Sequence, residues 1–249
     1  MSHNLTNVQI WVNNLDQPSE TIQNLEKILS EDEKERAMRF RFAEHRRRFI
    51  VARGGLREIL GHYLNLAPQD VRFEYNAKGK PFLCSSLNRE LQFNVSHSHE
   101  LALYGVAQSS KIGVDLEYVR TVKDLEHIAE RFFCPSEAAI VKTLSSKEKE
   151  KAFFKIWTAK EAYLKATGEG IAGGLNQVEV SISKRSASQR ASGQFQGLKS
   201  IAGDEQAVNQ WRLWSFFPKP DYVATIAVED VDRVLSWKIF DWNLFDKNA

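Results

Sequence analysis

The segment Lys155–Lys165 (KIWTAKEAYLK) constrains the fold more than any other, because its spacing predicts a helix that cannot lie on an open surface. At about 100° per residue, Thr158, Glu161 and Lys165 share one face of this helix. Apolar residues border that face and form a second stripe opposite it: Phe154, Ile156, Trp157, Ala159, Tyr163, Leu164 and Ala166. A helix that is apolar on two sides should be covered by protein on both.

Two interpretations of Glu161 and Lys165 are open from this segment alone. Residues four apart on a helix are neighbours, so one interpretation is an ordinary ion pair on a surface helix. In a covered helix, however, a carboxylate and an ammonium are costly to desolvate unless they are paired or bind something. The second interpretation is therefore a binding or catalytic site, and the rest of the chain decides between the two.

The composition of the chain is that of a globular protein. Its 249 residues are 43% hydrophobic and 27% charged, which suits one large or two small domains. The formal charge of +2 gives no global reason to expect nucleic acid or a membrane as a partner. Cys84 and Cys134 are too few for a disulfide framework and too far apart for a metal knuckle. With no signal-peptide pattern and no run of about 18 apolar residues, we predict a cytoplasmic protein.

Arginines are crowded between residues 36 and 57: Arg36, Arg39, Arg41, Arg46, Arg47, Arg48, Arg53 and Arg57. They indicate either a solvated helix face with salt bridges to Glu33, Glu35 and Glu44, or an anion-binding site. A nucleic-acid site would also need exposed aromatic side chains between the basic residues. The aromatic residues of this region are instead predicted to belong to the helix core: Phe40, Phe42, Phe49 and Tyr63.

Hydrophobic periodicity and turn residues divide the chain into alternating elements. Helices are predicted at residues 19–29, 30–39, 43–64, 124–131 and 136–144, and in the segment that ends at Gly168. Strands are predicted at 8–12, 71–75, 91–95, 101–107, 111–118, 178–182, 210–217, 222–228 and 236–240. Residues 76–81 are expected to form a turn, 145–151 a charged connection and 183–203 a surface connection. Both halves run from helices to strands, which permits a duplicated architecture.

The segment Ile112–Glu117 brings two carboxylates onto one face of a predicted strand. The period of two places Asp115 and Glu117 opposite the apolar residues of the segment. Two ionised carboxylates at this spacing repel each other, and a divalent cation such as Mg²⁺ would relieve the repulsion. A solvated strand face is the alternative. If Glu161 joined the pair, three carboxylates would surround one Mg²⁺ beside Lys165. Such an arrangement suits an enzyme that transfers a phosphate-linked group.

His97 is open to three interpretations from its own sequence context. It could be a metal ligand, although the segment SHSH at residues 96–99 does not have the spacing of a helical zinc pair. A lone histidine is more often structural. With Lys80 and the nearby arginines, it could instead bind a second phosphate.

Four segments stand out in order along the chain: Gly79–Pro81 (GKP), Phe93–His97 (FNVSH), Ile112–Glu117 (IGVDLE) and Phe154–Lys165 (FKIWTAKEAYLK). In order and spacing they resemble the signature segments of the Sfp-type 4′-phosphopantetheinyl transferases. Each motif alone is weak, but four in register make a specific match. The resemblance runs from about residue 30 to about residue 175.

The resemblance implies a fold and an activity. The expected fold is α+β, a pseudo-twofold pair of similar α/β lobes at residues 1–112 and 113–249, with the active site in the cleft between them. The expected activity is transfer of the 4′-phosphopantetheine group from coenzyme A to a serine of an apo acyl or peptidyl carrier protein, with release of adenosine 3′,5′-bisphosphate. The expected partners are coenzyme A, Mg²⁺ and the carrier protein, without nucleic acid or a membrane, and the expected state is a monomer.

The resemblance also implies roles for the carboxylates. By motif position, Asp115, Glu117 and Glu161 would hold Mg²⁺ against the pyrophosphate. Glu161 would also act as the base towards the carrier serine, and Lys165 would bind the phosphate. The expected catalytic residues are therefore Asp115, Glu161 and Lys165.

The nucleotide of coenzyme A, and its 3′-phosphate in particular, would meet a further set of residues: Arg36, Arg48, Lys80, Ser96, His97 and Lys165. Arg36 and Arg48 are aligned through less distinctive sequence than the others. The family position just before residues 77–81 is sometimes an arginine, whereas Tyr75 and Asn76 stand there in this chain. One phosphate contact is therefore missing or moved.

Two other classes of protein compete with this interpretation. One is a non-catalytic anion- or nucleic-acid-binding module built on Arg36–Arg57, although the face of Asp115 and Glu117 would repel a polyanion. The other is a different Mg²⁺-dependent phosphotransferase, but the sequence contains no G-x-x-x-x-G-K-[ST] loop. The transferase accounts for more of the chain than either alternative.

Overall fold

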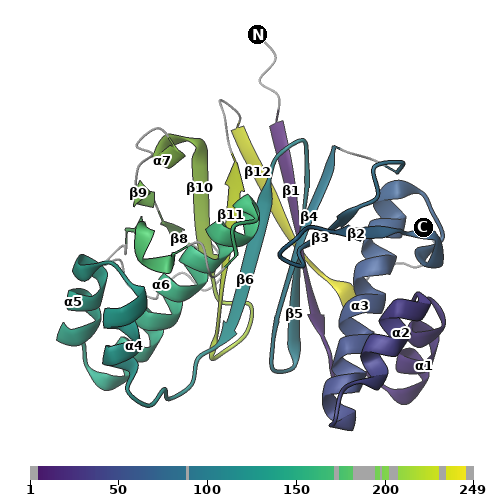
Figure 1. The fold of residues 1–249 in the computed structure, drawn as a ribbon, viewed down its shortest axis with the longest axis horizontal. Coiled ribbons are helices and arrows are strands. Elements are labelled where there is room, and N and C mark those ends of the chain that lie inside the picture. The colour runs from purple at the N-terminus through teal and green to yellow at the C-terminus, as the bar shows by residue number, and fades with distance from the viewer. Residues whose placement is uncertain are drawn as a thin grey trace.

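A computed structural model of the chain describes residues 5–87, 90–170, 174–181, 194–196, 198–201, 207–229 and 234–244. Its main body is formed by two four-stranded sheets that are flanked by helices (Figure 1). Within the described residues, no helix combines the length and the apolar composition that crossing a membrane requires. The mixed α/β character expected from the sequence is confirmed.

The first sheet has the strand order β12-β1-β5-β4. Its strands are β1 (Leu5–Asn14), β4 (Leu91–Ser98), β5 (Leu101–Gln108) and β12 (Val234–Asp241). β12 pairs parallel with β1, and the other pairs are antiparallel. The C-terminal strand therefore returns to the sheet that the N-terminal strand begins, so the strands of this sheet come from both halves of the chain.

The second sheet has the order β6-β11-β10-β8 and is antiparallel throughout. Its strands are β6 (Ile112–Tyr118), β8 (Gln194–Gln196), β10 (Trp211–Phe216) and β11 (Tyr222–Glu229). Two short ladders lie apart from the large sheets. They pair β2 (Phe73–Tyr75) with β3 (Pro81–Leu83), and β7 (Val178–Val180) with β9 (Leu198–Ile201).

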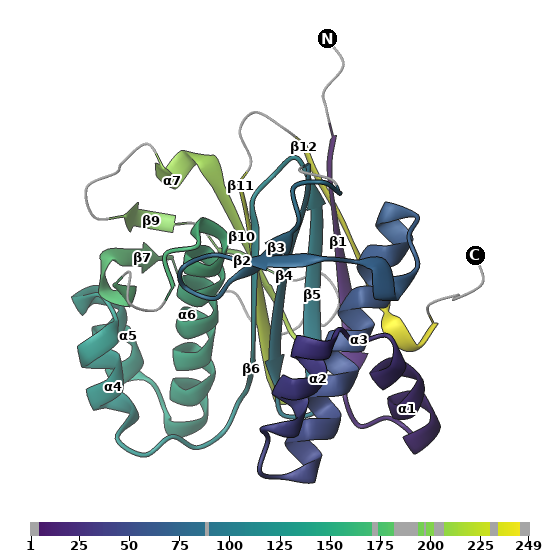
Figure 2. The same cartoon turned by 45° about the vertical axis from the view of Figure 1, so that its right-hand side comes forward.

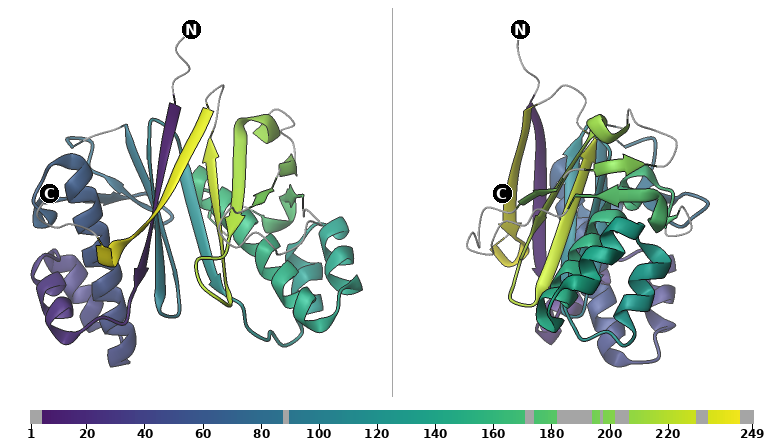
Figure 3. Two further views of the ribbon diagram at one scale, coloured as in Figure 1. Left: turned by 180° about the vertical axis from the view of Figure 1, so that it is seen from behind. Right: turned by 90° about the vertical axis from the view of Figure 1, so that its left-hand side faces the viewer.

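Helices cover the outer face of each large sheet, as two views of the ribbon show (Figures 1 and 3). The first sheet carries α1 (Ser19–Lys27), α2 (Glu31–Met38) and α3 (Ala43–Leu64). The second carries α4 (Leu125–Phe132), α5 (Pro135–Thr143) and α6 (Ser146–Thr167). A short helix, α7 (Ala207–Gln210), precedes β10. Single 3₁₀ turns occur at Pro68–Asp70, Leu175–Gln177 and Trp242–Leu244.

Three apolar clusters fill the spaces between these layers. One lies between α1–α3 and the first sheet, and one between α4–α6 and the second sheet. The third lies between the sheets, where the period of two directs alternate side chains inwards. It contains Val8, Ile10, Leu101, Leu103, Ala107, Ile112, Val114, Leu116, Trp214, Phe216, Tyr222, Ala224, Ile226 and Val228. The order of layers is therefore helix, sheet, sheet, helix.

The structure corrects two predictions about local structure and adds one strand. Residues 146–151, expected as a charged connection, form the first turns of α6, because Lys and Glu are both good helix formers. The described parts of 183–203 include the strands β8 and β9. β3 was not predicted at all, and it exists through pairing with β2. The remainder of 183–203 lies outside the described residues, and the division at residues 112 and 113 stays a prediction.

Gly113 allows β6 and α6 to approach closely. A Cβ atom at this position would lie 1.9 Å from the backbone oxygen of Ala162 and 2.5 Å from the backbone nitrogen of Ala166. Both atoms belong to α6, so no side-chain rotation could relieve the contact. Only glycine fits between this strand and this helix.

We expect Gly113→Ala to lower the free energy of unfolding by at least about 1–3 kcal/mol, because the added methyl group must push α6 away from β6. Gly105→Ala is a matched control. Its Cβ would meet Val114 Cγ1 at 2.7 Å and Ile112 Cδ1 at 2.8 Å, which are side-chain atoms that can move. Denaturant midpoints measure both losses, and a loss at Gly105 as large as that at Gly113 would contradict the backbone explanation.

Candidate active site

Side chains of β4 join the edges of the two large sheets. Asn94, Ser96 and Ser98 are spaced two apart and therefore share one face of β4. Asn94 Oδ1 accepts the backbone N–H of Val114 at 2.9 Å. Ser96 Oγ and Ser98 Oγ accept the next two alternate N–H groups of β6, at 3.2 and 3.1 Å. These bonds satisfy donors of β6 that would otherwise be buried without a partner.

The same two serine hydroxyls bind the predicted carboxylates. Ser96 Oγ donates to Asp115 Oδ1 at 3.0 Å, and Ser98 Oγ donates to Glu117 Oε2 at 3.0 Å. Asp115 is only 4% exposed and Glu117 is partly buried. The solvated strand face that was the alternative for Asp115 is therefore wrong, and the predicted sharing of one face by Asp115 and Glu117 is confirmed.

Lys165 of α6 reaches across to β6. Its Nζ lies 2.6 Å from Asp115 Oδ1 and 2.9 Å from Ser96 Oγ. The surface ion pair between Glu161 and Lys165 is therefore the wrong interpretation, because Lys165 pairs with another element. Glu161 is 4% exposed, which confirms that this face of α6 is covered. Within the described residues, Glu161 Oε1 and Asp115 Oδ2 are buried without a hydrogen-bond partner.

The electrostatics of this cluster favour a proton or a cation. Burial, and then the negative charges of Asp115 and Glu117, raise the pKa of Glu161 to about 7 against the opposing positive charge of Lys165. Burial and then Asp115 raise the pKa of Glu117. The described residues contain no group of three or more His, Cys, Asp or Glu side chains already placed to hold a metal ion. Asp115 and Glu161, two of the three predicted metal ligands, nevertheless each have an oxygen without a hydrogen-bond partner in the part of the chain that the structure describes.

Lys80 approaches the cluster from the turn between β2 and β3. Its Nζ donates to the backbone oxygens of Lys165 and Ala166, so it caps the C-terminal end of α6. Lys78 of the same turn donates to Glu169 O. Burial, and then the charge of Lys111, lower the pKa of Lys80 to about 8. The structure therefore brings Lys80 beside Lys165, although the two lie far apart in the sequence.

His97 and Arg36 belong to the same neighbourhood, whereas Arg48 has other partners. The pKa of His97 is lowered by the surroundings that desolvate its ring, and then by the positive charges of Lys165 and Arg36, against the pull of Asp115. Arg48 binds Asp16 at 2.8 Å and Glu44 at 2.7 Å. The nucleotide-binding roles of all three residues stay predictions.

Comparison with known proteins supplies the family. Residues 16–109 match a model described as 4′-phosphopantetheinyl transferase, N-terminal, and residues 111–227 match one described as 4′-phosphopantetheinyl transferase superfamily. The chain is 43% identical to the 4′-phosphopantetheinyl transferase HetI of Nostoc sp., over 89% of this chain and 87% of that protein. The chain belongs to the Sfp-type 4′-phosphopantetheinyl transferase family.

Two further relatives agree with this assignment. A putative 4′-phosphopantetheinyl transferase of Synechocystis sp. is 39% identical to this transferase over 68% of each chain. The 4′-phosphopantetheinyl transferase psf-1 of Bacillus pumilus is 31% identical, over 66% of this chain and 68% of its own. The resemblance stated from the four motifs is thereby confirmed, and the protein is an enzyme of this class.

Most of the arginines between residues 36 and 57 of this transferase form salt bridges. Arg57 Nε lies 2.6 Å from Glu33 Oε2, and Arg53 binds the other oxygen of the same carboxylate. Arg39 pairs with Glu35. The salt-bridge interpretation is therefore confirmed at these positions, but the pair of Arg57 and Glu33 is buried rather than solvated.

The aromatic residues between the arginines are not all core residues. Phe40 is 39% exposed and Phe42 is 59% exposed, so their predicted place in the helix core is wrong. The reason is local: α2 ends at Met38 and α3 begins at Ala43, so helical periodicity does not apply to the loop between them. Phe49 lies within α3 and is partly buried.

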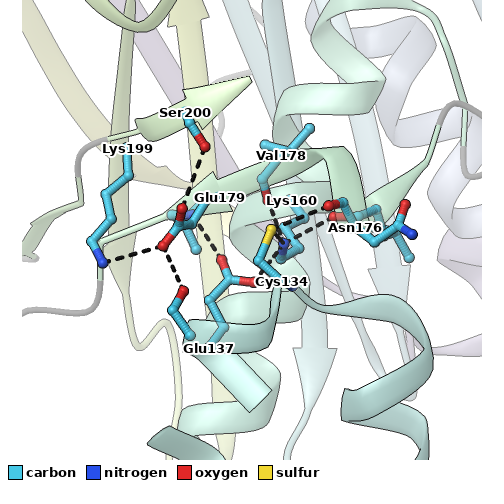
Figure 4. A network of polar contacts seen from close by, with 11 residues as sticks. Cys134, Glu137, Lys160, Asn176, Val178, Glu179, Lys199 and Ser200 are labelled. Atoms are coloured by element: carbon cyan, nitrogen blue, oxygen red, sulfur yellow. Dashed lines mark hydrogen bonds and ion pairs between the residues drawn. The ribbon is translucent and has the colours of Figure 1, made fainter. Parts of the chain in front are cut away.

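A buried ion pair on the opposite side of α6 fixes the orientation of this helix (Figure 4). Lys160 Nζ lies 2.7 Å from Glu137 Oε2 and donates to the backbone oxygens of Leu175 and Val178. Glu137 also accepts the N–H groups of Cys134 and Val180. The pair is fully buried and has several further hydrogen bonds, which compensate its desolvation.

Sequence reasoning missed this pair and the bridging serines. Lys160 stands directly before Glu161, and residues one apart on a helix point about 100° apart. Because Lys160 is held towards α5 and β7, Glu161 turns towards β6. A possible signal was the alternation of Asn94, Ser96 and Ser98 in a strand whose other residues are mostly apolar.

We expect Glu161→Gln to stabilise the metal-free transferase at pH 8. The pKa of Glu161 is raised from 4.5 to about 7, so the folded protein binds more protons than the unfolded chain between these values, and stability falls as pH rises through that window. The glutamine variant does not ionise and so does not lose this stability. We expect its free energy of unfolding at pH 8 to exceed that of the parent by about 1–2 kcal/mol, after allowance for solvent screening.

Urea unfolding in the presence of a chelator, at pH 8 and at pH 4, is the measurement. At pH 4 the two proteins should differ little, because Glu161 is then protonated. Glu126→Gln serves as the surface control, since Glu126 pairs with Lys149 on the surface. A Glu161→Gln variant that is less stable than its parent at pH 8 would contradict the burial cost.

Proposed function

We propose that this transferase moves the 4′-phosphopantetheine group from coenzyme A to a serine of an apo acyl or peptidyl carrier protein, with Mg²⁺ and with release of adenosine 3′,5′-bisphosphate. The observation that carries the proposal is the cluster of Asp115, Glu161 and Lys165, in which two buried carboxylate oxygens have no hydrogen-bond partner among the described residues and lie beside an ammonium. Membership of the family supports the reaction class. The three carboxylates of this region outnumber the ammonium of Lys165, which suits a substrate that arrives with a metal ion.

The residues present fit Mg²⁺. It prefers oxygen ligands and keeps water and substrate phosphate in its shell, so a few carboxylates suffice. Asp115, Glu117 and Glu161 would hold it, because Asp115 Oδ2 and Glu161 Oε1 lack partners within the described residues and Glu117 is partly buried beside them. When bound, Mg²⁺ would neutralise the negative charge of the pyrophosphate.

Glu161 is proposed as the base for the carrier serine. In the metal-free protein its pKa is raised to about 7, so this carboxylate has a higher affinity for a proton than an ordinary glutamate. The serine oxygen attacks the β-phosphorus of coenzyme A, a new P–O bond forms, and the bond from that phosphorus to the bridging oxygen breaks. The serine proton passes to Glu161, and the electron pair leaves with adenosine 3′,5′-bisphosphate.

Lys165 is proposed to bind the phosphate on which this charge develops. Asp115 and Ser96 both hold its Nζ, so the ammonium is positioned before the substrate arrives. Such preorganisation is the main contribution that a protein makes to phosphoryl transfer. Asp115 therefore serves twice, as a proposed metal ligand and as the partner that orients Lys165.

The nucleotide end of coenzyme A is proposed to lie against Arg36, Lys80, Ser96 and His97, with Arg48 as a further contact. The charges that act on His97 and the position of Lys80 at the end of α6 support this placement. We further propose a cleft between two lobes divided at residues 112 and 113, which the meeting of the two family-model matches between residues 109 and 111 supports. A cytoplasmic monomer without nucleic-acid or membrane partners completes the proposal.

We expect the transferase to add one phosphopantetheine to a serine of an apo carrier protein incubated with coenzyme A and Mg²⁺, as read by mass spectrometry. Asp115→Asn should lower the transfer rate about 10²-fold or more, because Lys165 loses its charged partner and the metal loses an anionic ligand. Asp70→Asn, at an exposed position, is the control. Calorimetric titration of Mg²⁺ with coenzyme A present should lose its signal in the Asp115 variant, and unchanged metal affinity would refute the ligand assignment.

We expect 3′-dephospho-coenzyme A to bind more weakly than coenzyme A, because a charge-assisted hydrogen bond contributes about 1.5–3 kcal/mol. His97→Ala should narrow this difference, whereas His127→Ala, on the exposed face of α4, should not. The pKa of His97 is lowered, so its positive charge, and with it the difference, should grow as pH falls below neutrality. Equal affinity of the wild-type protein for both ligands would show that the 3′-phosphate is not bound here.

A further inference from the structure

The loop that connects α2 to α3 carries apolar side chains into solvent. We call Met38–Phe42 (MRFRF) the α2–α3 corner. Met38 is 64% exposed, and the two phenylalanines are also exposed. The other large exposed apolar side chains of the described residues lie singly or in pairs elsewhere: Leu66, Tyr75, Phe82, Phe217 and Ile239. Three such side chains within five residues make the corner the densest of these places, and exposed apolar patches of this kind often mark interaction sites.

Contacts with α3 hold the rings of the corner in place. The Phe40 ring lies 5.3 Å from the ring of Phe49, and the Phe42 ring lies 5.8 Å from that of His45. The guanidinium of Arg41 lies 5.5 Å from the Phe42 ring. The corner is therefore an ordered surface in which apolar and positively charged groups alternate. Ordered aromatic and arginine side chains are the residues that dominate protein–protein binding energies.

A short chain of contacts connects the corner to Arg36, which is one of the residues proposed to bind the nucleotide. Arg36 lies 5.4 Å from the ring of Phe49, which in turn contacts Phe40. The positive charge of Arg36 is also one of the causes that lower the pKa of His97. A molecule bound to Phe40 is therefore separated from Arg36 by only two side chains, those of Phe40 and Phe49. α2 and α3 pack side by side on the outer face of the first sheet, so the corner is at the end of this helix pair (Figure 2).

The chemistry of the corner suits a protein surface better than a nucleic acid. Arg39 and Arg41 alternate with apolar side chains, which fits apolar groups flanked by carboxylates. Glu35 and Glu44 border the corner, so its arginines do not continue into the long positive stripe that a polyanion requires. Met38 offers no flat face on which a base could stack.

We propose that the α2–α3 corner is a docking surface for the carrier protein, which it contacts through an apolar patch flanked by carboxylates. This inference rests on the proposed function. In the proposed transfer, the carrier protein must bring its serine hydroxyl to Glu161, and a partner of that size also covers the surface of the transferase around the site. The arginines speed the encounter, and the apolar groups retain the bound carrier.

The test measures KM for the carrier in two variants, Phe42→Ser and Arg41→Glu. Each should raise KM about tenfold or more, because a well-placed aromatic or arginine at an interface has effects of this size. The kcat at saturating carrier and the KM for coenzyme A should stay unchanged. Both side chains are exposed, so neither variant should lower the thermal midpoint.

Each variant has a matched control elsewhere on the surface. Leu66→Ser removes an exposed apolar side chain at the other end of α3. Arg131→Glu reverses the charge of an arginine whose guanidinium lies 5.2 Å from the ring of its neighbour Phe132. This contact resembles that of Arg41 with Phe42. Neither control should change KM for the carrier. Higher salt should raise the carrier KM of the wild type more than that of Arg41→Glu.

The outcomes separate this proposal from the function on which it rests. If the wild-type protein does not modify the carrier, the proposed function fails. If it does, but the corner variants keep the wild-type KM or change it no more than the controls, the docking proposal alone is overturned. Binding of a fluorescein-labelled single-stranded oligonucleotide that is lost in the corner variants, with carrier KM unchanged, would assign the surface to nucleic acid instead.

Discussion

The candidate site depends on two serine hydroxyl groups, each of which both accepts and donates a hydrogen bond. Ser96 and Ser98 each accept an N–H of β6 and donate to a carboxylate on that strand. One side chain therefore joins the edges of two sheets and supplies Asp115 or Glu117 with a partner. A carboxylate can be buried only where such partners exist. The joint between the sheets and the position of the site are thus one feature.

The two sides of α6 show how the site remains incomplete in a stable fold. On one side, Lys160 and Glu137 are buried with their hydrogen bonds made. On the other, Glu161 is buried, and one of its oxygens has no hydrogen-bond partner among the described residues. Burial raises the pKa of this carboxyl, which costs stability above neutral pH. The satisfied pair holds the helix in the orientation that the unsatisfied carboxylate requires. Functional sites commonly carry such a cost, which packing elsewhere offsets.

Local periodicity was sufficient for the main features of the site. The covering of α6 on both faces followed from its two apolar stripes, and the common face of Asp115 and Glu117 followed from strand alternation. Both patterns repeat within a few residues, so a single segment shows them. Phe40 and Phe42 were misplaced for the same reason, since the helical pattern was continued through a loop that ends it.

By itself, the sequence determined the elements that carry the carboxylates and the family that its motifs resemble. Only the tertiary structure decided that Lys165 pairs with Asp115 instead of Glu161, that Lys80 caps α6, and that β12 returns beside β1. Each of these contacts joins segments far apart in the chain. A charged or hydrogen-bonding side chain can satisfy its needs with many partners, and nothing in the local pattern selects one. The selection is made when the sheets and helices pack, because burial then leaves each group only the partners within its reach.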